Sequence, residues 1–536
     1  MKAQVERKNG AILSYLSIFM STVIQLLYTP FLIKRLGSSE YGLYSIVASI
    51  ISYLTVLDFG FGDAIIMYTA KYKAQGKEKE EQQLQGMFLK IFTVIGFITF
   101  VLGIVIYFLT PLLFSSSMTI EEISKMKIMI LILSFNLAIT FPMGVYGSII
   151  KAYEKFTFQK IISIMHTLIL PLIMIPMLFI GGKSVTLSLV TTIGNMFVLY
   201  SNYIYCEKKL KIKVKFSKID KPLFKAIFSY SFYIFLNIIV DRINWSVDQT
   251  ILGIYVGTTA VSCYAVAARI NDLFIKLSTA ISGILFPKVS KMIAANCSDK
   301  EMSDEFIKVG RLQLYIVFLM TTGLIVFGKQ FFNLWVGSEY SSAYYVSLFL
   351  IIPLSIPLIQ NLGISILQAK NIHKFRSILY SFVAIGNILL SIPLAKNYGE
   401  IGSAIGTALS LTIGNIIIMN IYYQLKAKIN IIEFWKQIFS MIIRLVIPLL
   451  LIILIKKLYF FNNWADIILY GGLYIIMYLI TAYNFVMNSY EKFIIQKIFK
   501  KVMLKKVKEW LTSNKEKNVV AVRHVIIHVL VVLSQW

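Results

Sequence analysis

The sequence predicts an all-α membrane protein with about fourteen transmembrane helices. The chain is 57% hydrophobic and 15% charged with a mean hydropathy of +0.74, whereas a soluble protein of 536 residues would need a more polar surface. Apolar runs of about 20 residues, the length that crosses a bilayer, recur from end to end. Two short stretches also recur further along the chain at the same offset in residue number, which indicates an internal repeat.

The apolar runs place the predicted helices in order along the chain. They span approximately residues 11–33, 41–66, 87–114, 128–150, 161–180, 185–206, 226–247, 258–286, 309–328, 342–366, 377–395, 401–424, 438–459 and 464–487. We expect four parts: six-helix bundles in 1–220 and 221–437, two added helices in 438–487, and a basic cytoplasmic tail in 488–536.

Lysine and arginine predict the orientation of these helices. With the N-terminus inside, the cytoplasmic segments hold 39 of the 53 basic residues, the outer loops hold 9, and 5 lie within helices. The positive-inside rule therefore predicts that both termini are cytoplasmic. The net charge of +27 belongs to loops at an anionic membrane face, so it predicts membrane lipids and no nucleic acid as partners.

The two ends of the chain and its cysteines carry weaker signals. The start "MKAQVERKNG" has no cleavage-type site, so the first apolar run is expected to remain as a helix. In the tail, 500–510 is typical of a basic surface helix, and 519–536 is expected to be interfacial or poorly ordered rather than a fifteenth span. The three cysteines fit neither a disulfide framework nor a metal site.

The internal repeat has an offset of 220 residues. The stretch "LGSSEYGLYSIVASI" (36–50) aligns without gaps to "VGTTAVSCYAVAARI" (256–270), and "TIGN" recurs at 192–195 and 412–415. Six helices per repeat place both halves the same way up, related by a pseudo-twofold axis along the membrane normal. A cleft between two such bundles is typical of an alternating-access transporter.

Several motifs resemble one transporter family. The chain carries "LGSSEYGLY" with "LTVLDFGFGDAI", then "KAYEKF", "FPKVSK" and "QAKNIHKF", and the resemblance covers about residues 10–425. These motifs are similar to the polysaccharide transporters of the multidrug/oligosaccharidyl-lipid/polysaccharide exporter superfamily. The resemblance implies a flippase that moves undecaprenyl-pyrophosphate-linked oligosaccharide repeat units across the bacterial inner membrane for O-antigen or capsule synthesis. Many members place an arginine after the Asp-x-Gly motif, whereas this chain has Met67 and Tyr68.

Charged residues inside predicted helices are candidates for the substrate site. A charge at the bilayer centre costs about 2.5–3.5 kcal/mol, so it normally faces protein or water. The helical spacing places these polar residues in stripes on the seventh and eighth helices. The predicted substrate-binding residues of the second half are Arg269, Lys276, Arg242, Arg311, Asn237 and Asn244. Pairing within the membrane, for example between Arg269 and Asp272, is the alternative reading.

The first half offers neutral groups and one acidic motif. Its stripe of Tyr44, Ser45, Ser49 and Ser52 suits sugar hydroxyls, whereas the second half is expected to hold the anionic end of the substrate. In "LDFGFGDAII" (57–66), Gly60 and Gly62 predict a hinge at the inner end of the second helix. The candidate residues for ion coupling or gating are Asp58, Asp241, Asp272 and Asp248, with Gly60 and Gly62.

Three functions remain open at this stage. A lipid-linked oligosaccharide flippase, driven by H⁺ or Na⁺ and using no cofactor, is the leading hypothesis, with lipids and other polysaccharide-assembly proteins as partners. A cation-coupled multidrug or small-molecule exporter of the same superfamily is the second, although the first helix has no carboxylate between Ala11 and Ile33. An integral-membrane enzyme of polysaccharide assembly is the third, but no catalytic motif supports it.

Overall fold

The computed structural model describes residues 2–216, 221–282, 286–370, 372, 374–459 and 463–497. Every regular element in these ranges is helical. The chain forms two compact units. The first comprises residues 1–434 with 461–467, and the second comprises 435–460 with 468–536.

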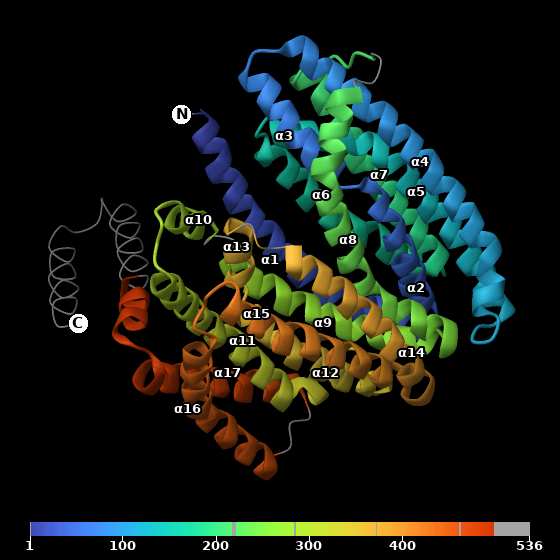
Figure 1. The fold of residues 1–536 in the computed structure, drawn as a ribbon. Coiled ribbons are helices and arrows are strands. Elements are labelled where there is room, and N and C mark those ends of the chain that lie inside the picture. The colour runs from blue at the N-terminus through green and yellow to red at the C-terminus, as the bar shows by residue number, and fades with distance from the viewer. Residues whose placement is uncertain are drawn as a thin grey trace, which may run out of the picture. The chain divides into compact units, whose positions relative to one another are not determined.

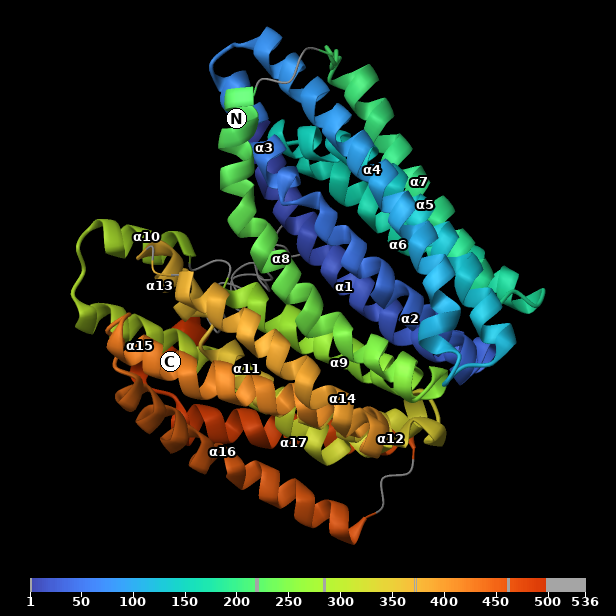
Figure 2. The same ribbon diagram turned by 45° about the vertical axis from the view of Figure 1, so that its right-hand side comes forward.

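The first half of the large unit contains six long helices with one break. Its elements are α1 (Lys2–Leu36), α2 (Ser38–Leu54), η1 (Thr55–Asp58), α3 (Phe61–Ala74), α4 (Glu78–Phe114), α5 (Ile120–Ala152), α6 (Phe156–Phe179), α7 (Ser184–Ile204) and η2 (Tyr205–Lys209). Figures 1 and 2 both show α4 lying along α5 over most of its length.

The second half repeats this order of long helices. Its elements are α8 (Lys221–Tyr255), α9 (Thr258–Ser282), α10 (Phe286–Ala294), α11 (Asp299–Trp335), η3 (Ser338–Tyr340), α12 (Ser341–Ile359), α13 (Leu362–Ala369), α14 (Lys374–Leu411), η4 (Thr412–Ile418) and α15 (Met419–Leu425). The last helices are α16 (Ile431–Leu458), α17 (Trp464–Thr481) and η5 (Ala482–Val486).

The repeat is visible in the turns that begin α2 and α9. Gly37 precedes α2 with φ 84°, and Gly257 precedes α9 with φ 122°, so both lie in the region that favours glycine. The two glycines are 220 residues apart in the sequence, as the repeat requires. Further along, the stacked pairs Phe158–Tyr205 and Phe375–Tyr422 match at an offset of 217, so the register slips by three residues between the two sites.

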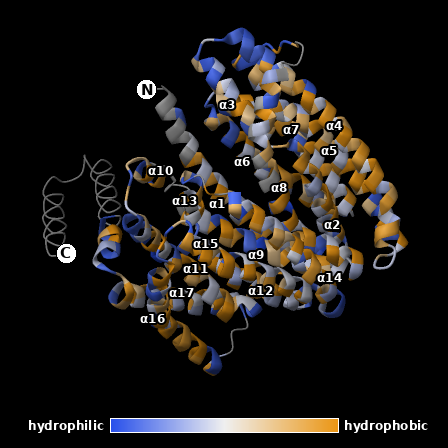
Figure 3. Cartoon of the chain, viewed as in Figure 1, coloured by the Kyte–Doolittle hydropathy of each residue, from blue (hydrophilic) through white to orange (hydrophobic). Residues whose placement is uncertain are grey.

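The helices have the lengths and surfaces of membrane spans. The described residues contain eleven apolar helices long enough to cross a bilayer, and one of these, residues 374–425, is divided by Gly399 at φ 57°. With α8 and α9, which are 35 and 25 residues long, the structure accommodates the fourteen predicted spans. Figure 3 shows apolar residues along α4 and α5, and α4 exposes Phe108 and Leu112 by more than 70%. The chain is a multi-pass membrane protein.

The predicted second helix, 41–66, is not continuous. α2 ends at Leu54, a short 3₁₀ turn follows, and Phe59 and Gly60 both adopt positive φ before α3 begins at Phe61. The predicted hinge is therefore a complete break. The matching helix α9 runs without interruption to Ser282, so the break between α2 and α3 has no counterpart within the described part of α9.

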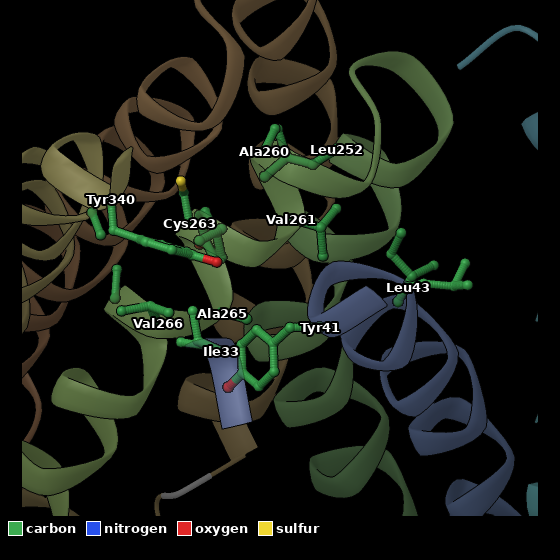
Figure 4. Packing of buried hydrophobic residues seen from close by; sticks show 14 of the residues in the cluster. Ile33, Tyr41, Leu43, Leu252, Ala260, Val261, Cys263, Ala265, Val266 and Tyr340 are labelled. Atoms are coloured by element: carbon green, nitrogen blue, oxygen red, sulfur yellow. The ribbon is translucent and has the colours of Figure 1, made fainter. Parts of the chain in front are cut away.

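A buried apolar cluster joins the two halves of the large unit. Figure 4 shows Ile33, Tyr41 and Leu43 of the first half packed near Val261 and Ala265 of α9. Leu43 and Val261 are completely buried. Across the same interface, Trp335 Nε1 donates a hydrogen bond of 2.6 Å to the carbonyl oxygen of Leu26. Buried apolar side chains and a hydrogen bond between the halves therefore hold them together at the end that carries Gly37 and Gly257.

The tight packing of α4 on α5 predicts a sensitive glycine. A Cβ added at Gly96 would overlap the carbonyl oxygen of Ala138, whereas one at Gly144 on α5 would meet nothing within 4 Å. We expect Gly96→Ala to lower the stability of the protein by about 1–3 kcal/mol, because backbone cannot move aside cheaply. Thermal unfolding in detergent, with Gly144→Ala as the control, measures this; equal melting temperatures for both variants would contradict the packing.

Candidate functional site

A cavity of about 200 Å³ lies between the two halves of the large unit. Three helices supply its polar walls: α2 from the first half, and α8 and α9 from the second. The polar lining residues include Tyr44, Ser45, Ser49, Ser52, Ser246, Gln249, Tyr264, Arg269, Asn271 and Asp272. The predicted residues Tyr44, Ser49, Ser52, Arg269 and Asp272 therefore come together at one site.

Arg269 supplies positive charge to this central cavity. Its side chain is exposed on the cavity wall, and its guanidinium hydrogen-bonds to the hydroxyl of Tyr41 in the first half. Asp272, one turn along α9, interacts electrostatically with Arg269 and also with Lys276. The position of Arg269 is compatible with substrate binding and also with pairing inside the membrane. A guanidinium has five N–H groups, so one that is paired can still donate hydrogen bonds to a substrate.

The serines of the first half bond across the interface. Ser49 Oγ donates to the carbonyl oxygen of Ser246 at 2.6 Å, and Ser52 Oγ donates to Ser246 Oγ at 2.9 Å. Tyr53 Oη lies 3.3 Å from Thr250 Oγ1. In this conformation these hydroxyls join α2 to α8, so Ser49 and Ser52 can donate a hydrogen bond to another group only when those bonds exchange.

A second set of hydrogen bonds between the two halves lies at one end of the cavity. Thr258 Oγ1 of the second half donates to Glu122 Oε1 of the first at 2.8 Å, and Ser117 Oγ donates to the carbonyl oxygen of Gly253 at 2.6 Å. Within the first half, Ser39 Oγ also donates to Glu122 Oε1, at 2.6 Å. Gly42 lies so close to Thr258 that an added Cβ would overlap its carbonyl oxygen. We call the residues Ser39, Gly42, Ser117, Glu122, Gly253 and Thr258 the interlobe seal.

Asp248 lies in a compact polar centre inside the second half. Its carboxylate is 1% exposed and accepts hydrogen bonds of 2.7 Å from Tyr264 Oη, Ser403 Oγ and Thr407 Oγ1. None of the ion pairs found among the described residues includes Asp248. A buried carboxylate surrounded by neutral oxygen atoms can accept a proton or a hard cation.

Asn244 and Asn387 lie beside the Asp248 centre. Both line a small cavity of about 10 Å³, and the side-chain amide nitrogen of Asn387 is buried without a hydrogen-bond partner. A volume of that size holds about one water molecule. Asn244 is therefore placed near the candidate coupling residue rather than in the central cavity.

Asp58 has a structural role at the break between α2 and α3. Its carboxylate accepts hydrogen bonds from the backbone N–H groups of Gly60 and Gly62, which begin α3. These donors have no partner within the helix, so the carboxylate stabilises the start of α3. Asp63 lies exposed in the first turn of the same helix.

The remaining candidates lie outside the central cavity. Lys276 and Arg242 are exposed, and Arg311 is half-buried and engaged with neighbours. Asp241 lines a separate cavity of about 230 Å³ together with Arg376. The side chain of Asn237 and the tail segments 500–510 and 519–536 lie outside the described residues.

The structure adds residues that the sequence pattern did not identify. Gln249 and Asn271 line the central cavity, and Tyr41 contacts Arg269. Arg376 lies just before the predicted helix 377–395, but it belongs to the first turn of α14 and lines a cavity. An apolar run extended by one residue at its start would include Arg376.

The described residues contain no candidate metal-binding site. No group of three or more His, Cys, Asp or Glu side chains in that part of the chain could hold a metal ion. The three cysteines are free thiols. The site is therefore a polar cavity between the two halves, and its charged and hydroxyl side chains can bind a polar ligand.

Comparison with known proteins identifies the family. A family model described as polysaccharide biosynthesis protein matches residues 8–293, just over half of the chain. The chain belongs to this family. The match includes α2, α8 and α9, so it covers all three helices that supply the polar walls of the central cavity.

Two curated proteins are similar to part of this chain. Two proteins of Haloferax volcanii are similar: the probable low-salt glycan biosynthesis flippase Agl15, 26% identical over 207 residues, and the probable flippase AglR, 30% identical over 195 residues. These alignments cover 38% and 33% of this chain and only 43% and 38% of the two relatives.

Solved structures resemble the fold over a longer range. The lipid II flippase MurJ in an inward closed conformation gives a TM-score of 0.68 at 19% identity, covering 88% of this chain and 97% of MurJ. An inward-facing multidrug resistance transporter of the MATE family gives 0.62 at 13% identity, covering 78% of this chain and 96% of that one. Identities this low establish a shared fold.

Proposed function

We propose that this protein is a flippase that moves lipid-linked oligosaccharides across the cytoplasmic membrane. The observation that carries the proposal is the central cavity, in which Arg269 and Asp272 of one half face the hydroxyl-rich helix α2 of the other. Arginine suits a phosphate group and neutral hydroxyls suit sugars. The relative named as a probable glycan biosynthesis flippase supports a glycan substrate. For a bacterial chain, the carrier is undecaprenyl pyrophosphate and the product an O-antigen or capsule precursor.

The distribution of basic residues supports a direction for this movement. With both termini cytoplasmic, the turns at Gly37 and Gly257 face the outside, and the interlobe seal lies at the external end of the cavity. The substrate then enters from the inner leaflet while the seal is formed. Opening the seal and closing the opposite end releases the oligosaccharide outside. In this scheme Ser49 and Ser52 exchange their bonds to Ser246 for bonds to sugar hydroxyls.

Ion coupling would be carried by the second half. Among the proposed coupling residues, Asp248 has a suitable surrounding, because three neutral hydroxyls contact its carboxylate and the described part of the chain offers it no ion pair. Binding of H⁺ or Na⁺ would neutralise the carboxylate and alter the packing of α8 against α14. Asp58 is engaged at a helix start, which makes it a less suitable carrier of the ion.

An ion-coupled exporter of drugs or other small molecules is the second candidate. The fold shared with a multidrug transporter favours it, because that likeness extends over 78% of the chain. The two candidates differ in phenotype. Loss of the gene product should remove a surface polysaccharide and accumulate lipid-linked units in the inner leaflet if it is a flippase, whereas drug sensitivity with intact polysaccharide would favour the exporter. If the protein were instead an enzyme of polysaccharide assembly, loss of the gene product would leave that enzyme's polysaccharide precursor unconverted.

Arg269 provides the sharpest variant for testing the flippase. Arg269→Ala should abolish surface polysaccharide in a complementation assay while the protein still inserts in the membrane at normal levels. The reason is that the variant loses the charge-assisted hydrogen bonds between Arg269 and the substrate's phosphate. Each lost bond weakens the free energy of substrate binding by about 1.5–3 kcal/mol. Lys127→Ala, a charge on α5 that stacks on Tyr107, is the matched control. Full complementation by Arg269→Ala would refute the role of the central cavity.

A further inference from the structure

A second polar cavity lies within the second half of the large unit. It has a volume of about 230 Å³ and is formed by α8, α13 and α14. Its polar lining residues are Asp241, Gln368, Arg376, Ser377 and Tyr380. We call this cavity the α8–α14 pocket. All three helices belong to the same half, so the pocket does not depend on contact between the halves.

The pocket carries two opposite charges. Asp241 and Arg376 interact electrostatically, and both line the same space. The guanidinium of Arg376 stacks on Tyr380, with Cζ 4.3 Å from the ring centroid, and this contact fixes the plane in which its N–H groups point. The charged side chains that line the pocket therefore balance, although Arg242 outside the lining also acts on Asp241, and the donors of Arg376 are held in place by Tyr380.

Charge balance decides which class of ligand the pocket can take. A phosphate would meet the carboxylate of Asp241, and like charges repel. A neutral, hydroxyl-rich ligand gains from both groups, because hydroxyls donate to Asp241 and accept from Arg376 and Gln368. The volume is below the roughly 300–1,000 Å³ of pockets for drug-sized ligands, so it suits a single sugar ring.

The repeat indicates that the fold itself does not require this charge pair. The register between the halves slips between offsets of 220 and 217, which places the counterparts of Asp241 at 21–24 and those of Arg376 at 156–159. None of these eight positions carries a charged residue. The first half therefore packs without the pair, and a need specific to the second half must explain it.

The position of the pocket links it to the central cavity. Asp241 lies one helical turn before Trp245, and Trp245 and Gln249 line the central cavity from the same helix. We propose that the α8–α14 pocket is a sugar-binding subsite that takes one neutral sugar ring through Asp241, Gln368, Arg376 and Tyr380. This inference rests on the proposed function, since it assigns part of the oligosaccharide to a pocket separate from Arg269.

Binding of free sugars tests the subsite without requiring transport. The full-length protein in nanodiscs is titrated with neutral methyl glycosides of hexoses and N-acetylhexosamines, and binding is followed by saturation-transfer NMR. We expect the double variant D241N/R376Q to bind at least tenfold more weakly than the unaltered protein. The controls Glu339→Gln and Lys329→Gln alter charges of the same half outside both cavities and should bind normally.

A single substitution then tests whether charge balance sets the ligand class. Asp241→Asn leaves Arg376 without its opposing charge in the pocket, so this variant should gain binding of inorganic phosphate beyond any that Arg269 provides, and adding Arg376→Gln should remove the gain. A structural role for the pair would not produce that change. Phosphate binding by the unaltered protein that is lost in R376Q, glycoside binding unchanged in the double variant, or no glycoside binding at all would each overturn the proposal.

The test also separates this inference from the flippase proposal. Arg269→Ala should retain glycoside binding in the α8–α14 pocket even though it abolishes polysaccharide export. If the protein exports no polysaccharide but binds glycosides through Asp241 and Arg376, the flippase proposal fails and the subsite stands. If export is normal in the double variant and glycoside binding is unchanged, the subsite fails and the flippase stands.

Discussion

Replacing Asp248 with asparagine is expected to reduce transport at least tenfold and to remove its dependence on an ion gradient. Tyr264, Ser403 and Thr407 all donate hydrogen bonds to this carboxylate. An asparagine amide has only one oxygen, so at least one donor would face an NH₂ group. Each lost bond to a charged group is worth about 1.5–3 kcal/mol, and about 1.4 kcal/mol corresponds to tenfold in an equilibrium constant.

Transport in proteoliposomes under separate Na⁺ and proton gradients measures this effect. The control Asp63→Asn removes an exposed carboxylate from α3 and should leave both rate and ion dependence unchanged. Thermal unfolding of both variants separates a folding defect from a coupling defect. A variant D248N that transports at the normal rate with its ion dependence intact would remove Asp248 from the coupling scheme.

Substituting Gly42 with valine should shift the protein away from the conformation described here. The glycine lets α2 approach the first turn of α9, where an added Cβ would lie 2.7 Å from the carbonyl carbon of Thr258. Overpacking of this kind costs about 1–3 kcal/mol, and a coupling energy of that size corresponds to a roughly 5- to 150-fold change in an equilibrium. The bond from Thr258 to Glu122 should weaken at the same time, because both residues belong to the interlobe seal.

Electron–electron distance measurements between spin labels detect this shift. Labels at Ile120 and Tyr398 occupy exposed positions in the two halves, 89% and 66% exposed, and their separation should increase in Gly42→Val. Transport should fall as well, because the proposed mechanism requires the seal to form in each cycle. Gly144→Ala, where an added Cβ has nothing within 4 Å, is the control. Identical distance distributions for all three proteins would show that the seal does not depend on Gly42.

The apolar runs predicted the helices well because each span must satisfy its backbone hydrogen bonds internally. The repeat correctly placed Gly37 and Gly257 at equivalent turns. The break at Phe59 and Gly60 was only partly predicted. Glycine signalled a hinge, but the left-handed conformation of Phe59 depends on local packing, including its stacking on Phe235 at a centroid distance of 4.6 Å.

The candidate site was predictable only where one helix face determines it. The stripe on α2 and the charges of α9 follow from helical periodicity, and the stripe does line one cavity with Arg269 and Asp272, whereas Lys276 lies outside it. The partners of Asp248 could not be predicted in the same way. Ser403 and Thr407 are 155 and 159 residues distant from it in sequence, and single hydroxyl residues in apolar helices give no signal of what they contact. Their relation to Asp248 arises from the packing of α14 on α8.

The most direct test of the proposed function is a flipping assay with purified protein in liposomes. A lipid-pyrophosphate-linked oligosaccharide carrying a fluorescent group is placed in both leaflets, and a membrane-impermeant reagent modifies the outer population. The unaltered protein should make nearly all of the substrate accessible, whereas liposomes with Arg269→Ala should stop at the outer-leaflet fraction. Equal accessibility with the unaltered protein and with empty liposomes would contradict the account.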